Sequence, residues 1–84
     1  MPSALELLAR YLVRTLHAVT AGRHGQGRML DELAVDAGMG EQTAAQAVDV
    51  ALRKGWIEER MRSVYLTESG RRAARRRAMR ARTI

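Results

Sequence analysis

Three polar side chains near the middle of the chain, Gln42, Thr43 and Gln46, have types and spacing that could recognise DNA bases. They fall within about one turn of each other near the start of a predicted helix over residues 41–54. Gln can make paired hydrogen bonds to adenine, and Thr can hydrogen-bond to several base edges. An ordinary solvent-facing side of a helix would have a similar composition, so both interpretations stay open.

Positive charge is concentrated at one end of the chain, where it could neutralise phosphates. From residue 61 onward eight arginines accompany one acidic residue, Glu68, whereas residues 1–60 hold seven basic and eight acidic residues, a net charge of −1. Such a field attracts polyanions such as nucleic acid, although a solvated, partly disordered tail would give the same pattern. The candidate phosphate contacts are Arg53, Lys54, Arg60, Arg62, Arg71 and Arg72. The expected C-terminal helix also carries Arg75, Arg76, Arg77, Arg80 and Arg82.

The sequence offers little material for catalysis or metal binding. It contains no cysteine, which excludes disulfides, thiolate metal sites and a thiol nucleophile. His17 and His24 have no second histidine at metal-ligand spacing. The acidic residues of segment 30–37 have no nucleophile or metal triad to pair with. We therefore expect no enzyme, no cofactor, no metal site and no small-molecule ligand.

The chain has 84 residues, enough for one domain over residues 1–84 with one small core. No apolar run approaches the roughly 20 residues that span a bilayer, and Glu6 interrupts the N-terminal apolar stretch where a signal peptide would be uninterrupted. These features predict a cytoplasmic protein without membrane contact.

Hydrophobic spacing predicts three helices before the arginine-rich end. Ser3 and Glu6 form a capping box that opens the first helix, which is expected to end near Ala21 with Gly22 in the left-handed position. A turn at residues 38–40 joins the second helix to the third, which Gly55 stops. The expected segments are an N-terminal helix (1–22), a flexible connection (23–28), a helix-turn-helix (28–54), a hairpin (55–66) and a C-terminal arginine-rich helix or tail (67–84).

The first helix has more apolar surface than one core can cover. Leu5, Leu8, Ala9, Leu12, Leu16 and Val19 share one side of the helical wheel. Leu7, Tyr11 and Ala18 form an adjoining apolar side, so we expect them to be a homodimer interface.

After Gly55 the apolar period changes from that of a helix to that of a strand. Residues 56–60 and 63–66 predict two short strands around a turn at Met61 and Arg62, and Thr67 can cap a last helix that begins near Glu68. The predicted fold class is therefore mainly α with a small two-stranded β-hairpin.

Two ordered segments carry a family resemblance. They are residues 52–60, LRKGWIEER, and residues 65–71, YLTESGR. Together with residues 30–34, LDELA, they resemble the stretch from the second helix through the wing in MarR-type and PadR-type winged-helix regulators. In those families a helix ends at Lys-Gly, and Leu-Thr-x-x-Gly closes the hairpin. The resemblance covers roughly residues 28–72.

The resemblance implies a winged helix-turn-helix that binds double-stranded DNA and regulates transcription. Helix 41–54 would enter the major groove, while the wing and the arginine tail would hold phosphates. The chain departs from the pattern in its short wing and in Glu41 and Asp49, which lie on the outward side of that helix. The alternative is a winged helix that binds a protein partner, since one fold serves both roles.

Overall fold

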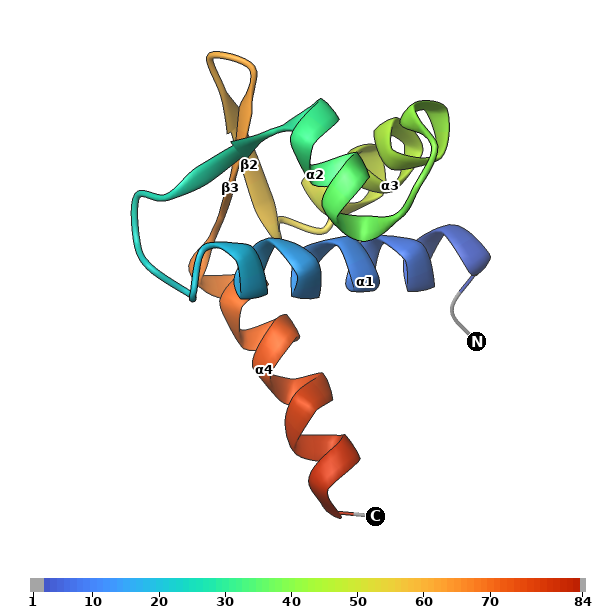
Figure 1. The fold of residues 1–84 in the computed structure, drawn as a ribbon. Helices are drawn as coiled ribbons and strands as arrows, with labels where there is room; N and C mark the ends of the chain where they lie inside the picture. The colour runs from blue at the N-terminus through green and yellow to red at the C-terminus, as the bar shows by residue number, and fades with distance from the viewer. Residues whose placement is uncertain (1–2, 84) are drawn as a thin grey trace.

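The computed structural model describes the backbone of residues 3–83 and the side chains of residues 3–75. Figure 1 shows the other helices packed around α1, with the strands at one end of the molecule. In chain order the elements are α1 (Ala4–Val19), β1 (Gly27–Met29), α2 (Leu30–Ala37), α3 (Glu41–Arg53), β2 (Ile57–Arg60), β3 (Ser63–Leu66) and α4 (Glu68–Thr83).

Helix α1 begins and ends close to the predicted positions. The Glu6 amide donates to the Ser3 hydroxyl at 3.1 Å, which confirms Ser3 as the N-cap. The Glu6 carboxylate does not complete the expected capping box, because it lies 3.2 Å from Lys54 Nζ instead. At the other end Thr20 donates to the Leu16 carbonyl at 2.7 Å, and Ala21 and Gly22 both take left-handed backbone conformations. The helix therefore ends two residues before the predicted Ala21.

A third strand, β1, was not expected from the sequence. It pairs antiparallel with β3, so the sheet has the order β1-β3-β2, with Arg28 opposite Val64. The predicted hairpin is confirmed by the antiparallel pairing of β2 with β3, but the sheet has one strand more than predicted, and the flexible connection predicted over residues 23–28 is wrong at residues 27 and 28. Three residues of mixed type carry no strand signal of their own, and β1 forms because β3 offers a free edge. Gly27 lies against the ring of Tyr65, where a Cβ atom would come within 2.6 Å of a ring carbon.

The central helix pair agrees closely with the prediction. Helix α2 ends at Ala37 and is capped by Gly38, whose φ is 67°. The Gly38 amide donates to the Val35 carbonyl at 3.0 Å, and the Met39 amide donates to the Ala34 carbonyl at 2.9 Å. After this turn α3 begins at Glu41 and ends at Arg53, followed by Gly55 with a φ of 76°.

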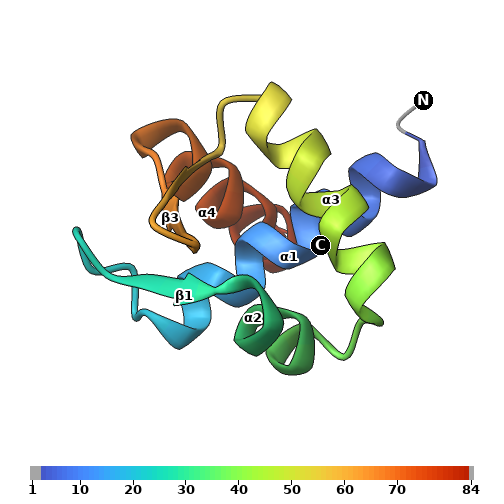
Figure 2. The same ribbon diagram turned by 90° about the horizontal axis from the view of Figure 1, so that it is seen from above.

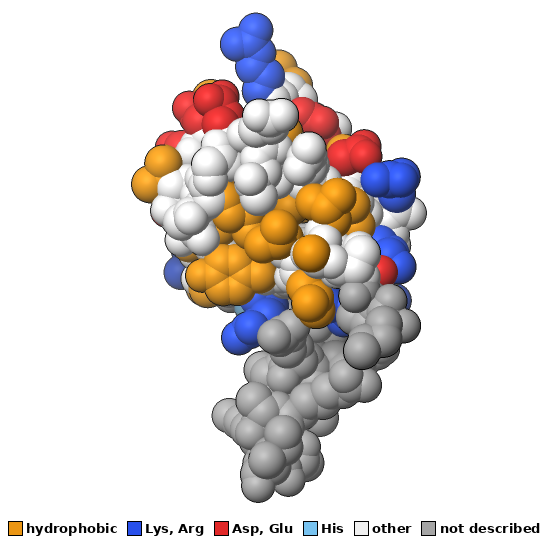
Figure 3. All heavy atoms as spheres, turned by 90° about the vertical axis from the view of Figure 1, so that its right-hand side faces the viewer, with side chains coloured by type: hydrophobic (Ala, Val, Ile, Leu, Met, Phe, Trp, Pro, Cys, Tyr) orange, Lys and Arg blue, Asp and Glu red, His pale blue; other side chains and the backbone are white. Residues whose placement is uncertain are grey.

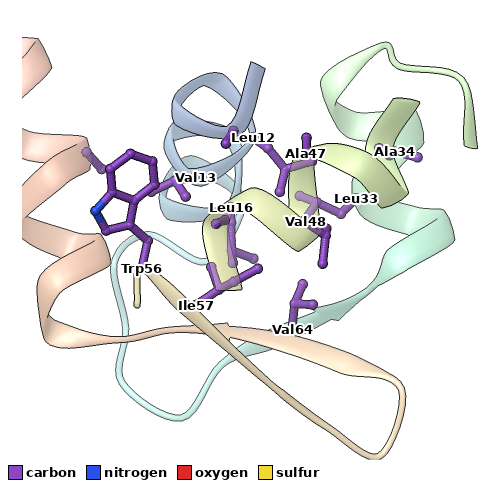
Figure 4. Close-up of a cluster of buried hydrophobic side chains, with 14 residues drawn as sticks. Leu12, Val13, Leu16, Leu33, Ala34, Ala47, Val48, Trp56, Ile57 and Val64 are labelled. Carbon is purple, nitrogen blue, oxygen red and sulfur yellow. The ribbon is translucent and has the colours of Figure 1, made fainter. Parts of the chain in front are cut away.

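The core lies where α1, α2, α3 and the sheet meet (Figure 4). Leu12, Leu16 and Leu33 are completely buried, and each such side chain contributes roughly 1.5–3 kcal/mol by leaving water. The α3 residues that face them are small, with Ala44 and Ala47 also fully buried, so α3 approaches α1 closely. Trp56 and Ile57 close the core beneath the hairpin.

Helix α4 leaves the body on the side of α1 opposite to α2 and α3 (Figures 1 and 2). Its main contacts are with α1 and β3. The whole is a mainly helical fold with a small antiparallel sheet, an arrangement compatible with the predicted winged helix.

Candidate nucleic-acid interface

The expected base-contacting residues lie on the side of α3 that faces away from the core. Gln42 and Gln46 are exposed, and Thr43 is half-buried. The two glutamines are four residues apart, so they point from the same side of the helix about one turn from each other. No hydrogen bond joins either amide to another described residue. Two amides are thus available together, whereas Thr43 is partly covered by its surroundings.

Basic residues at the C-terminal end of α3 are held by carboxylates of the same chain. Arg53 lies 2.9 Å from Asp49, and both side chains are mostly exposed. Lys54 Nζ lies 3.2 Å from Glu6 at the beginning of α1. A phosphate would have to replace these carboxylates, so both residues are less available than the sequence suggested.

The β2–β3 hairpin presents a single uncommitted arginine at its tip. Met61 and Arg62 have positive φ values of 48° and 70°, which is the geometry of a two-residue hairpin turn. Arg62 is exposed and has no ion-pair partner among the described residues. Arg60 instead lies along the strands, with its guanidinium 4.4 Å from the Tyr65 ring centre and 3.4 Å from Glu58.

Arg71 does not lie on the surface, where the sequence analysis had placed it. The residue is only 9% exposed, and its Nε atom is buried without a hydrogen bond, 3.8 Å from Glu68. Position 71 precedes the buried Ala74 by three residues, so it belongs to the inward side of α4. The prediction that Arg71 contacts a phosphate is therefore corrected, because its side chain is buried. Its spacing of three residues from Ala74 in the sequence could have revealed the inward position. Arg72 is exposed, but it lies on α4, across α1 from α3.

The Leu-Thr-x-x-Gly segment has a structural explanation. The Thr67 hydroxyl accepts the Gly70 amide at 3.0 Å and donates to the Gly55 carbonyl, so one side chain caps α4 and ties it to the end of α3. The Thr67 amide also donates to the Trp56 carbonyl at 3.0 Å. A Cβ atom on Gly70 would come within 1.9 Å of that carbonyl oxygen. These residues join α4 to the hairpin and to the end of α3.

Charge is divided unevenly between two parts of the molecule. Residues 30–66, which form α2, α3 and the hairpin, contain four basic and seven acidic residues, a net charge of −3. The whole chain has a net charge of +6, so the residues outside this range have a net charge of +9. The part of the chain that includes Gln42 and Gln46 thus has a net negative charge, and the net positive charge comes from the rest of the sequence.

The expected dimer residues are exposed, as the helical wheel predicted. Leu7 and Tyr11 are 45% and 47% exposed, and Ala18 is also exposed, one above another along α1. Figure 3 shows hydrophobic side chains gathered in the middle of the face toward which the beginning of α1 points. The arrangement leaves an apolar surface uncovered within the described part of a single chain.

Sequence analysis missed a charged cluster above Trp56. The Arg10 guanidinium lies 5.0 Å from the Trp56 ring centre and Lys54 Nζ lies 6.0 Å from it, while Glu6 pairs with both cations. The cluster fastens the end of α3 to the first turns of α1. Its members are far apart in sequence, so no local pattern signals it.

No protein-family model matches the chain, and no curated protein sequence matches it. Among the described residues no helix is both long and apolar enough to cross a membrane, and no three histidine or acidic side chains gather as metal ligands.

Proposed function

We propose that the chain is a winged-helix protein of the kind seen in MarR-type and PadR-type regulators, and that it binds double-stranded DNA to regulate transcription in the cytoplasm. One observation carries the proposal: Gln42 and Gln46 are exposed together at the beginning of α3, in a chain whose β2–β3 hairpin also ends in an exposed arginine. The first turns of a second helix of this kind enter the major groove, where paired amides can recognise adenine.

In this proposal the hairpin and the end of α3 hold the DNA backbone. Arg62 at the hairpin tip contacts phosphates or the minor groove directly. Arg53, Lys54 and Arg60 reach phosphates only by leaving Asp49, Glu6 and Glu58. Because each exchange replaces one ion pair by another, these three residues add less affinity than their charge suggests. Arg72 lies on α4, across α1 from α3, so in this proposal it does not contact the duplex that α3 holds.

A homodimer supplies two copies of α3. Leu7, Tyr11 and Ala18 of each protomer form the contact in this proposal, which removes exposed apolar surface from water. A two-fold symmetric dimer recognises an inverted repeat whose half-sites lie about one DNA turn, roughly 34–36 Å, apart.

The proposal is tested by selecting preferred duplexes from a randomised pool and measuring the binding of single variants to them. Gln46→Ala should lower affinity for the best duplex by about 1–3 kcal/mol, roughly 5- to 150-fold, and relax preference at one position. Gln26→Ala is the matched control, because it removes an exposed glutamine from the loop before β1. If Gln46→Ala and Gln26→Ala bind every duplex like the unchanged chain, α3 does not recognise bases through this side chain.

A second candidate function is binding to a protein partner through the same surface. The net charge of −3 over residues 30–66 favours it, because a negatively charged surface repels phosphates and attracts basic proteins. This candidate predicts that random duplex DNA binds poorly even at about 50 mM salt, where phosphate contacts are strongest.

A further inference from the structure

Helix α4 carries a basic surface that the α3 site does not use. Arg72 and Arg75 are exposed and three residues apart, so they extend from the same side of the helix. Ala74 is buried and Ala73 half-buried, which fixes the opposite side of α4 against the body of the protein. The beginning of α4 is therefore firmly placed, with its cations directed to solvent.

These two arginines have no carboxylate partner among the described residues, a property that they share with Arg14, Arg23 and Arg62 but not with five other basic residues. Arg10, Arg28, Arg53, Lys54 and Arg60 each lie within 4 Å of a carboxylate. Arg72 and Arg75 have no such partner among the described residues. Glu68, the single acidic residue in the sequence of α4, lies beside Arg71. The sequence adds arginines at 76, 77, 80 and 82, whose side chains lie outside the described part.

The position of α4 separates this surface from Gln42, Gln46 and the hairpin tip. Helix α3 packs on one side of α1 and turns its polar residues away from it, whereas α4 extends from the other side (Figure 1). The molecule is 38 Å long, and DNA has a persistence length of about 150 bp. A short duplex lying on α3 stays nearly straight and does not curl around the body to α4.

We propose that α4 is a second DNA-binding surface, which holds the phosphates of a different duplex segment from the one in contact with α3, so that the protein joins two segments. The first contact rests on the function proposed above, whereas the second needs only α4. Contact through arginines alone predicts no sequence preference, because phosphates carry no sequence information. Each phosphate contact adds about 0.9 to the salt slope, so two described arginines give about 1.8.

A two-duplex capture assay tests this proposal with the full 84-residue chain. A selected duplex with both half-sites is fixed to beads and saturated with protein, so that α3 of each protomer is occupied. A labelled duplex of unrelated sequence is then added, and its retention is measured over a range of salt concentrations. The test variant is Arg72→Glu with Arg75→Glu, and circular dichroism checks that it folds. A second variant, Arg72→Gln with Arg75→Gln, removes the charges without reversing them.

The unchanged chain should retain the second duplex, and both variants should lose it while still occupying the fixed duplex. We expect retention to fall about tenfold or more, and the salt slope of the remaining capture to fall by about 1.8. If the fixed duplex binds protein but captures no second duplex, or if both variants capture it normally, the α4 proposal is wrong. Capture of an RNA hairpin but not of duplex DNA would also overturn it. Failure of any duplex to hold the protein would refute both proposals, whereas equal binding of every duplex that both variants lose would refute only the function proposed for α3.

Discussion

Replacing Gly70 by alanine should destabilise the protein, although the same change stabilises most helices. Gly70 lies in the first turn of α4, where an added Cβ atom would come within 1.9 Å of the Trp56 carbonyl oxygen. That oxygen accepts the Thr67 amide, and the neighbouring Gly55 carbonyl accepts the Thr67 hydroxyl. Helix α4 must therefore move away from the hairpin, and the movement stretches both hydrogen bonds.

The size of the effect follows from three contributions. Overpacking at a close backbone contact costs about 1–3 kcal/mol. Two weakened hydrogen bonds add about 1 kcal/mol each at most. Alanine regains about 1 kcal/mol over glycine through its higher helix propensity. The expected net loss is about 2 kcal/mol, which for a domain of this size lowers Tm by roughly 8–16 °C.

Urea denaturation followed by circular dichroism measures this loss. Gly40→Ala is the matched control, because Gly40 has a φ of −64° and no atom lies within 4 Å of an added Cβ. It should cost less than about 1 kcal/mol, the cost of a poorer N-cap. Both variants must be compared at one protein concentration, since dimerisation changes apparent stability. A Gly70→Ala protein as stable as the Gly40→Ala protein would refute the close contact between α4 and Trp56.

Two further predictions concern the surfaces of the chain. Leu7→Glu combined with Tyr11→Glu should give a folded monomer with weakened DNA binding, whereas an unchanged chain that sediments as a monomer at tens of micromolar would contradict the dimer. Asp49→Asn should free Arg53 from its 2.9 Å ion pair and tighten binding to random duplex DNA at low salt, with little gain at high salt. Glu32→Gln, an equal charge change on α2, is its control, and an equal gain there would show that only net charge matters.

The helices could be predicted from sequence because their signals are local. Gly38 and Gly55 supply left-handed conformations at helix ends, and Thr67 caps α4, so each boundary follows from a few adjacent residues. The hairpin was equally accessible, because its alternating residues surround a two-residue turn.

The features that escaped prediction depend on partners distant in sequence. Strand β1 exists because β3 offers an edge about 35 residues later, and residues 27–29 alone contain no strand pattern. The cluster of Glu6, Arg10, Lys54 and Trp56 also joins two ends of the fold. Counting charges along the chain placed Arg71 and Arg72 together, whereas the helical phase of α4 buries one and exposes the other.

The most direct test of the proposed DNA contact is a map of amide chemical shifts in the ¹⁵N-labelled chain during titration with the selected duplex. The account predicts that the largest changes fall at the beginning of α3, around Gln42 and Gln46, and at the hairpin tip around Arg62. Weaker changes in α4 would appear only once a second duplex segment is present in excess. If the first additions of duplex shift only α4 amides, or shift none, α3 is not the DNA-binding element and the central claim is contradicted.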